Sequence, residues 1–287
     1  MQLILFILIF PFLGLSENAQ ASQQSAITLS ISKADLDEYQ NFVKGRPAEE
    51  IDNFHGVYLR EIVESILIQK ALKLGGYDKP IKLQPVINYN HSLQLVSAGV
   101  IDISGISLWH YDAVKIDHDV YISRAIIEQG DYIVGFYTKA NNNKALNASS
   151  LSEIQQLAAV SSRKWFTDWR TLRKLRVRTM LDTFPFANMV KAVHSGKGDF
   201  TLAPFSSNSD LSIEQDGFKL IPIPNIAMAL NDSRHVTISN KHPESQLMLE
   251  ALNKGLSQLN DDNKIHQALA QSGFYNTQTA DWPVINL

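Results

Sequence analysis

The chain has 287 residues, of which 45% are hydrophobic and 19% charged, a composition typical of a globular protein with one large domain or two modest ones. Its formal net charge of -3 gives no general reason to expect binding to nucleic acid or to an acidic membrane surface. Cysteine is absent, which excludes disulfides, thiol catalysis, cysteine-ligated zinc and lipid attachment to an N-terminal cysteine.

The N-terminus has the pattern of a secretory signal. Residues 3–15 are apolar and are followed, after a polar step, by an A-x-A site that ends at Ala21. This pattern predicts a signal peptide at 1–21 that is cleaved to leave Ser22 as the mature N-terminus. No Lys or Arg precedes the apolar segment, so an uncleaved anchor stays open as an alternative, although a spanning helix needs about 20 apolar residues. We therefore expect an exported protein, and the missing lipidation cysteine favours the periplasm of a Gram-negative cell.

The first half of the mature chain alternates between strand and helix patterns. Residues 54–74 carry apolar side chains at helical spacing, and the glycines at 75 and 76 supply the left-handed residue that stops a helix. Strands are expected at 26–32, 82–87 and 101–108, and a second helix at 92–98. This β-α-β-α-β order predicts parallel strands joined by right-handed crossovers.

A second series repeats this alternation after extended stretches at 121–127 and 132–139. Its expected strands and helices are 157–160, 165–175, 177–181, 185–194 and 199–203. A strand at 236–239 and helices at 243–259 and 264–272 close the chain.

One helix-to-strand turn occurs in both series. Gly99 precedes Asp102 by three residues in the first series, and Gly196 precedes Asp199 by three in the second. Glycine ends a helix at low conformational cost, and Asp is polar where the chain enters a buried strand. Gly-x-x-Asp alone is common in α/β folds, but its recurrence at the same place in two series predicts two similar α/β lobes.

Several stretches follow one another in an informative order: VSAGVIDISGISL, RAIIEQGDYIVGFYTK, HSGKGDF and an ending that runs from HVTISNKHPE to ALAQSGF. In this order the chain resembles the periplasmic solute-binding proteins of ABC transporters, of the amino-acid-binding (family 3) type with the type II fold. The resemblance implies two α/β lobes joined by two hinge strands, with 26–128 and 233–287 in lobe 1 and 129–232 in lobe 2. It also implies a monomer with its ligand in the cleft between the lobes, and an inner-membrane ABC permease or a sensor protein as partner.

The resemblance places ligand contacts at the carboxyl ends of strands in both lobes. In lobe 1 these contacts come from the loop after the first strand and from the end of the third strand. In lobe 2 the turn at 161–164 precedes a helix whose free N–H groups favour an anionic group. The expected ligand-binding residues are Asp35, Tyr39, Ser107, Trp109, Ser162, Arg163, Lys164, Thr183 and Phe205.

Two positions depart from the family. The Arg that grips the ligand carboxylate in amino-acid binders corresponds here to Val114, and the acid that holds the ammonium corresponds to Pro204. A buried charge whose partner is removed costs about 3–5 kcal/mol, so a standard L-amino acid is not the expected ligand. Aromatic side chains near the same strand ends suit a planar or partly apolar ligand, with the hydrophobic core as the alternative place for these rings. They are Trp109, Tyr111, Trp165, Phe166, Phe184 and Phe205.

Other patterns favour ordinary explanations. The stretch 110–119 has two His and three Asp without metal-ligand spacing, which favours a solvated loop over a metal site. Residues 163–178 carry seven Lys or Arg against one Asp, which fits a solvated helix face or a docking surface for an acidic partner. No G-x-S-x-G turn, P-loop or cofactor motif occurs, so we expect no catalytic residues, no cofactor and no nucleic-acid partner.

These observations indicate a protein, not an enzyme, that captures a small polar molecule in the cleft and delivers it to an ABC transporter. Two alternatives stay open. One is a ligand-sensing or accessory periplasmic protein of the same fold, and the other is an enzyme of the dehydratase type, which is known on this fold.

Overall fold

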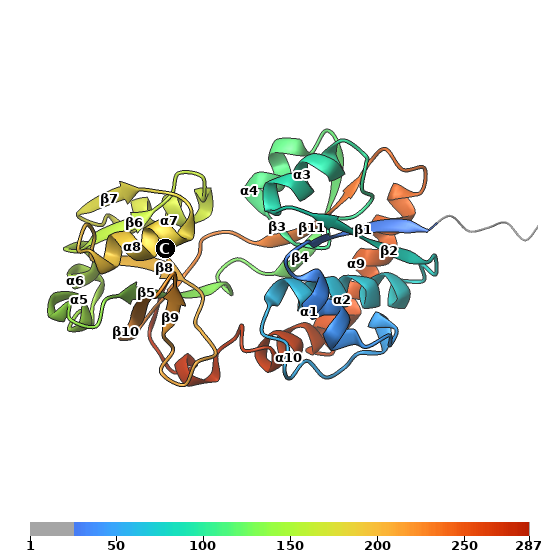
Figure 1. Cartoon of the computed structure of the whole chain (residues 1–287). Helices are drawn as coiled ribbons and strands as arrows, with labels where there is room; N and C mark the ends of the chain where they lie inside the picture. The colour runs from blue at the N-terminus through green and yellow to red at the C-terminus, as the bar shows by residue number, and fades with distance from the viewer. Residues whose placement is uncertain (1–25, 287) are drawn as a thin grey trace, which may run out of the picture.

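The computed structural model describes residues 26–286, so the predicted signal peptide at 1–21 and its cleavage site lie outside the described residues. Figure 1 shows two α/β lobes with chain segments passing between them. In the described part of the chain, no helix is long and apolar enough to cross a membrane.

The sheet of the first lobe is assembled from distant parts of the chain. Its strands are β1 (Ile27–Ser32), β2 (Ile81–Val86), β3 (Leu108–Trp109), β4 (Val120–Ile127) and β11 (Arg234–Ser239). β1 pairs in parallel with β2, and β11 pairs antiparallel with both β3 and β4. Bridges from Ile103 to Leu29 and to Ile238 join the two parts. The helices are α1 (Leu36–Val43), α2 (Arg60–Gly75), α3 (Tyr89–Ser97), α4 (His110–Ala113), α9 (Ser245–Asp261) and α10 (Lys264–Gln271), with short turns η1 (Ala48–Glu50) and η2 (Val114–Ile116).

The strand expected at 101–108 is interrupted in the structure. Ile103 pairs only through isolated bridges, and regular pairing resumes at β3. Between them the backbone of Gly105 lies so close to β1 that a Cβ there would be 1.9 Å from the carbonyl oxygen of Ser30. This close approach takes the place of continuous strand pairing, and beyond it Ser107 lies buried while Trp109 lines the cleft.

Helix α2 packs on α9 at the centre of the first lobe. A Cβ at Gly75 would lie 1.9 Å from the carbonyl oxygen of Ala251, and one at Gly255 would lie 1.9 Å from that of Ala71. Glycine at both contacts is therefore what lets the two helices approach so closely. The helix begins at Arg60, later than the residue 54 expected from its apolar spacing, so Arg60 lies in its first turn.

The second lobe has one sheet in the order β12-β10-β5-β8-β6-β7, with β9 paired to β10. β6 is parallel to both β7 and β8, as the second strand-helix series predicts. The strands are β5 (Ile133–Thr138), β6 (Ala158–Ser161), β7 (Thr179–Asp182), β8 (Phe200–Ala203), β9 (Ile213–Gln215), β10 (Phe218–Ala229) and β12 (Val284–Ile285). The helices are α5 (Asn143–Leu146), α6 (Leu151–Gln155), α7 (Phe166–Leu175) and α8 (Phe186–His194).

The repeated turn makes the same contact in both lobes. Gly99 and Gly196 have positive φ angles of 74° and 77°. The Asp102 carboxylate accepts the backbone N–H of Thr28 at 2.7 Å, and the Asp199 carboxylate accepts that of Ala158 at 2.7 Å. Each Asp therefore ties its strand to the start of the neighbouring strand, which confirms the expectation of two similar lobes.

Within residues 26–286 three segments cross between the lobes, and the first two are the hinge segments. Residues 128–132 join β4 to β5 and residues 230–233 join β10 to β11, and the backbone N–H of Leu230 donates to the carbonyl of Tyr132 at 2.9 Å. The third crossing was not expected, because residues 233–287 were all assigned to lobe 1. After α10 the chain passes to the other lobe, where β12 pairs in parallel with β10 (Figure 1).

Candidate functional site

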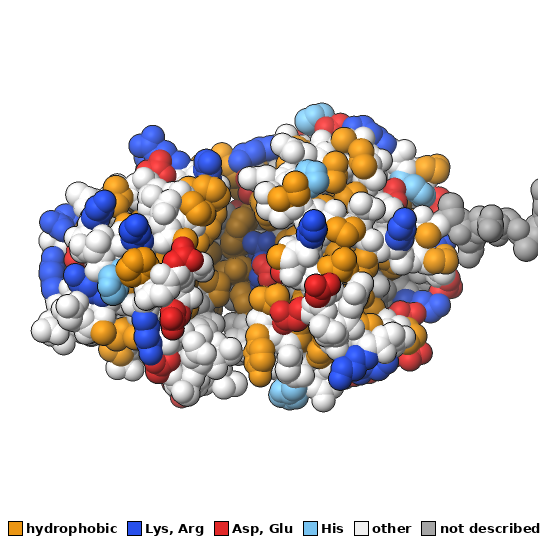
Figure 2. Space-filling model, viewed as in Figure 1, with side chains coloured by type: hydrophobic (Ala, Val, Ile, Leu, Met, Phe, Trp, Pro, Cys, Tyr) orange, Lys and Arg blue, Asp and Glu red, His pale blue; other side chains and the backbone are white. Residues whose placement is uncertain are grey.

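A cleft of about 780 Å³ lies between the two lobes. Figure 2 shows it as a hollow with hydrophobic side chains inside. Lobe 1 contributes the start of α2, the loop between β2 and α3 and the end of β3, while lobe 2 contributes the start of α7 and the residues after β8. Strand ends and helix starts from both lobes therefore form one cavity, which is where open α/β sheets place their ligands.

Aromatic side chains form much of the cleft wall. The ring of Trp109 in lobe 1 lies 4.9 Å from that of Tyr132 in the first crossing segment, at 50°. In lobe 2 the rings of Trp165 and Phe186 lie 5.9 Å apart at 25°. Such surfaces suit a ligand with a flat or apolar part. The aromatic residues that line the cleft are Tyr89, Trp109, Tyr132, Trp165, Phe166, Phe184 and Phe186.

A buried network of charges lies beneath the lobe 1 side of the cleft. Glu64 is fully buried and accepts hydrogen bonds from Arg60, from the Ser107 backbone N–H at 3.1 Å and from the Ser107 hydroxyl at 2.8 Å. Arg234 donates from Nε to the Ser107 hydroxyl at 2.7 Å and from Nη2 to the Ser107 carbonyl. Arg60 also pairs with Glu61 at 2.6 Å. Burial alone would lower the pKa of Arg60, but Glu61 and Glu64 raise it above its ordinary value.

Rings cover both guanidinium groups. Arg234 Cζ lies 4.5 Å from the ring centroid of Trp109, and Arg60 Cζ lies 5.7 Å from that of Tyr132 and 5.8 Å from that of Phe274. Cation–π contacts are strongest where water is excluded, and Arg60 and Arg234 are only 8% and 4% exposed. The cleft floor therefore combines aromatic rings with cations that already have partners in the protein.

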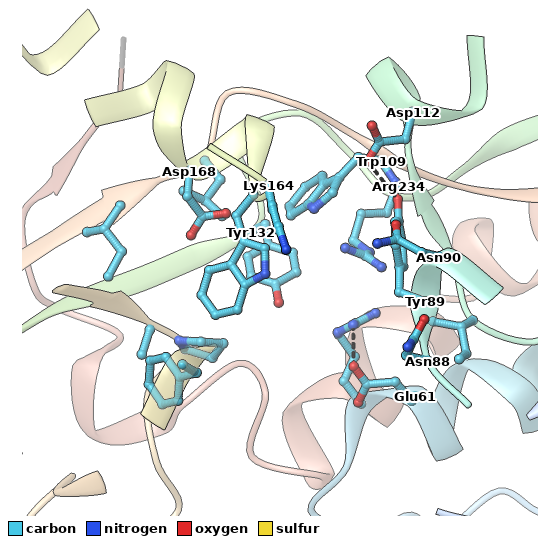
Figure 3. A pocket seen from close by; sticks show the side chains of 18 of the residues that line it. Glu61, Asn88, Tyr89, Asn90, Trp109, Asp112, Tyr132, Lys164, Asp168 and Arg234 are labelled. Atoms are coloured by element: carbon cyan, nitrogen blue, oxygen red, sulfur yellow. Dashed lines mark hydrogen bonds and ion pairs between the residues drawn. The ribbon is translucent and has the colours of Figure 1, made fainter. Parts of the chain in front are cut away.

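Two charged side chains of lobe 2, Asp168 and Lys164, line the cleft. Figure 3 shows Asp168 and Lys164 on one side of the cavity and Glu61 and Arg234 on the other. Burial raises the pKa of Asp168 to about 7, although the positive charge of Arg234 acts to lower it. Among the described residues Asp168 forms no ion pair, while the Lys164 ammonium lies 4.4 Å from the ring centroid of Phe184. Asp168 is therefore available to a hydrogen-bond donor on a ligand.

Three of the expected ligand-binding residues line the cleft, namely Asp35, Trp109 and Lys164. Ser107 lies below the floor and holds Arg234 and Glu64 in place. Tyr39 is buried in lobe 1, where its hydroxyl accepts a hydrogen bond from Gln69 at 3.0 Å.

The remaining expected residues lie in lobe 2 outside the cleft lining. Ser162 is buried and accepts the backbone N–H of Lys164 at 3.2 Å, while Arg163 is 76% exposed and lies 3.6 Å from Asp182. Thr183 donates its backbone N–H to Ser161 at 2.9 Å. Phe205 lines an adjoining, smaller cavity of about 330 Å³, which shares Arg60, Glu61, Tyr132, Pro204 and Ile213 with the cleft.

The expected aromatic residues divide in the same way. Trp109, Trp165, Phe166 and Phe184 line the cleft, whereas Tyr111 stacks on Phe166 at 3.6 Å from outside the lining. In the stretch 110–119, Asp112 lines the cleft and accepts a hydrogen bond from the Tyr89 hydroxyl at 3.1 Å. Within residues 26–286 no three His, Asp or Glu side chains are grouped so that they could hold a metal ion.

Several charged groups of the cleft lie outside the set expected from the sequence. Val114 lies outside the lining and Pro204 lies within it, so neither position supplies a charge. Besides the expected Asp35 and Lys164, the lining holds Arg60, Arg234 and Asp168, which were not expected. One sequence signal was present, since Arg60, Glu61 and Glu64 bring three charges into the first turns of a helix whose next residues are mostly apolar and buried.

Similar solved structures share this architecture. The periplasmic VFT2 domain of BvgS from Bordetella pertussis aligns with a TM-score of 0.54 and 15% identity over 72% of this chain and 82% of that chain. A probable amino-acid ABC transporter extracellular-binding protein from Bacillus subtilis gives 0.56 and 10%, over 86% and 97%. An amino acid ABC transporter substrate-binding protein from Streptococcus pneumoniae, bound to L-arginine, gives 0.51 and 13%, over 87% and 94%.

The chain has the two-lobed fold of type II periplasmic binding proteins. No family model and no curated protein matches it in sequence. Identities of 10–15% show a shared fold and leave the ligand to be argued from the cleft itself.

Replacing Glu64 with Gln should lower the free energy of unfolding by about 3 kcal/mol, because it removes a buried partner of Arg60. Urea denaturation followed by tryptophan fluorescence measures this change. Glu61→Gln is the matched control, since the Glu61 side chain is 34% exposed and its ion pair should contribute about 1 kcal/mol or less. Equal losses in the two variants would contradict a buried network centred on Glu64.

The pKa of Asp168 predicts a pH dependence of stability. Because its folded value of about 7 exceeds the unfolded value of 3.8, the folded state holds more protons between these pH values. The contribution of Asp168 to the free energy of unfolding therefore falls as pH rises from 4 to 7 and is then constant. Urea denaturation at several pH values should show Asp168→Asn gaining on the wild type over this range. The exposed Asp117→Asn should run parallel to wild type, and a parallel Asp168→Asn profile would refute the raised pKa.

Proposed function

We propose that the protein is a periplasmic solute-binding protein that captures a small polar molecule in the interlobe cleft and delivers it to an ABC transporter. The observation that carries this proposal is a single cavity lined by strand ends and helix starts of both lobes. Rotation of the lobes about the crossing segments would close the cavity around its ligand, with an inner-membrane permease as partner. Two similar structures are named as ABC transporter binding proteins, which supports this role.

The charges in the cleft support a ligand that is neutral or partly cationic and carries a flat or apolar part. Arg60 is balanced by Glu61 and Glu64, and Arg234 is engaged by Ser107 and covered by Trp109. Arg60 is thereby neutralised within the protein, whereas Arg234 donates only to Ser107 and has no acidic partner among the described residues. The further acids in the lining still outnumber Arg234 and Lys164 together. These acids are Asp35, Asp112 and Asp168. The two anchor positions of the family are Val114 and Pro204, so a standard L-amino acid, which presents a carboxylate beside its ammonium, is not the proposed ligand.

Two other functions have one supporting observation each. A sensing or accessory role is favoured by the similar structure that is named as a periplasmic domain of BvgS and not as a transporter component. An enzyme is favoured by Asp168, since an unpaired carboxyl with a pKa of about 7 in a cleft suits a general acid. We propose binding without turnover, because the cleft lining includes no His and no paired nucleophile and base. Following a bound compound over time distinguishes binding from turnover, because only an enzyme would convert the compound to a product.

A thermal-shift screen of residues 22–287 against a metabolite library tests the binding function. A ligand present at about 100 times its Kd should add about 2.7 kcal/mol of stability. We expect hits among neutral or cationic molecules with a flat or apolar part, and no comparable shift from standard L-amino acids.

Cleft variants locate the binding of any hit. Trp109→Ala and Asp168→Asn should reduce the shift, while Arg173→Ala on the exposed face of α7 should leave it unchanged. Large shifts from standard L-amino acids would contradict the proposed ligand class. A broad library without a single hit would count against the binding function itself.

A further inference from the structure

The segment after α10 is anchored in lobe 1 at its beginning. Gly273 ends the helix with a φ of 80°, and the backbone N–H of Tyr275 donates to the carbonyl of Leu269 at 3.2 Å. The ring of Tyr275 stacks on His266 of α10 with centroids 4.9 Å apart. The ring of Phe274 lies 4.9 Å from that of Tyr132, a residue of the first hinge segment. Residues up to 275 therefore belong with lobe 1 and the hinge.

The rest of this segment is anchored in lobe 2. The Asn276 side-chain amide donates to the carbonyl of Ser206 at 2.8 Å, and the Trp282 ring packs edge-on against Phe205 at 5.3 Å. The Ala227 backbone N–H donates to the carbonyl of Pro283 at 2.9 Å, after which β12 pairs with β10. A short turn, η3 (Thr277–Thr279), lies between these anchors.

The chain that connects the two sets of anchors is as short as it can be. Tyr275 is the last anchor on lobe 1 and Asn276 the first on lobe 2, so one peptide unit of about 3.8 Å between Cα atoms connects them. The two hinge segments lie together, since Leu230 donates to Tyr132, and by themselves they would permit rotation about several axes. A third short connection, which starts beside them at Phe274 and continues to its anchors on lobe 2, leaves fewer rotations possible without breaking an anchor.

We propose that residues 273–286 form a C-terminal strap that limits how far, and about which axis, the two lobes rotate. The strap also reaches the cleft, because Phe274 covers the guanidinium of Arg60 at 5.8 Å. Weakening its attachment to lobe 2 therefore frees lobe motion while the hinge segments stay intact. This inference goes beyond the proposed solute-binding function and concerns the free protein, whatever the cleft binds.

Distance measurements between the lobes in the ligand-free protein test the strap. The chain has no cysteine, so a Lys82→Cys, Lys191→Cys pair on β2 and α8 provides two unique and exposed spin-label sites. Double electron–electron resonance should give a narrow distance distribution in the otherwise wild-type chain. Trp282→Ala and Asn276→Ala should broaden it and shift its mean, with the double variant showing the larger effect.

Tyr121→Ala is the matched control, since it removes a half-exposed ring from β4 in lobe 1, far from the strap in sequence and in contacts. Its distribution should equal that of the wild type. Circular dichroism checks that each variant is folded, and point substitutions are used so that the test does not depend on a truncated chain. An unchanged distribution in folded Trp282→Ala, Asn276→Ala double variant would overturn the proposal, and no ligand result bears on this outcome.

Discussion

The structure of the cleft depends on a buried ionic network centred on Glu64. This carboxylate has no exposure to water, and it binds Arg60 of its own helix together with the backbone and side chain of Ser107. Ser107 in turn holds Arg234, so three elements (α2, the segment before β3, and β11) meet at one point. Because a buried charge that loses its partner is strongly destabilising, these elements cannot shift independently. Trp109 and Tyr132, which cover the two guanidinium groups, are thereby fixed as the wall of the cleft.

A second set of contacts holds the lobes against each other beside the hinge. Tyr111 of α4 stacks on Phe166 of α7 with centroids 3.6 Å apart and planes at 6°. The buried Asp232, in the second hinge segment, accepts the Thr167 hydroxyl at 3.2 Å and the Tyr111 backbone N–H at 3.4 Å. Phe166 also lines the cleft, so the interlobe stack and the cavity share a side chain. Motion of one lobe would therefore change the cleft wall that contacts a bound ligand.

Local signals in the sequence predicted the parts of the fold that depend on local structure. The glycines and aspartates at 99–102 and 196–199 predicted the repeated turn, because positive φ and strand entry are properties of a few adjacent residues. The rings at the ends of predicted strands pointed to four residues of the cleft wall. The prediction of a continuous strand at 101–108 was wrong because Gly105 lies against Ser30. This is a contact between segments that are distant in sequence, and the spacing of apolar residues does not reveal such contacts.

Several charged groups of the cleft were missed for the same reason. Arg234 is hydrogen-bonded to Ser107, from which it is separated by 127 positions of sequence. The family's Arg position was located by its distance from Asp102, which can identify only residues that follow Asp102 closely in sequence. The pKa of Asp168 is raised because the folded protein shields its carboxyl from water. The residues next to Asp168 in sequence do not indicate this shielding. The two-residue strand β12 is too short to give an alternating pattern, so the third crossing could not be expected.

Small-angle X-ray scattering tests the central claim, that the interlobe cleft binds a small molecule and closes on it. Scattering curves would be recorded for the free protein and for the protein saturated with its best stabilising compound. We predict a smaller radius of gyration in the bound state, because rotation of the lobes brings α2 and α7 closer together across the cavity. A compound that binds tightly at the cleft residues and leaves the radius of gyration unchanged would contradict the account.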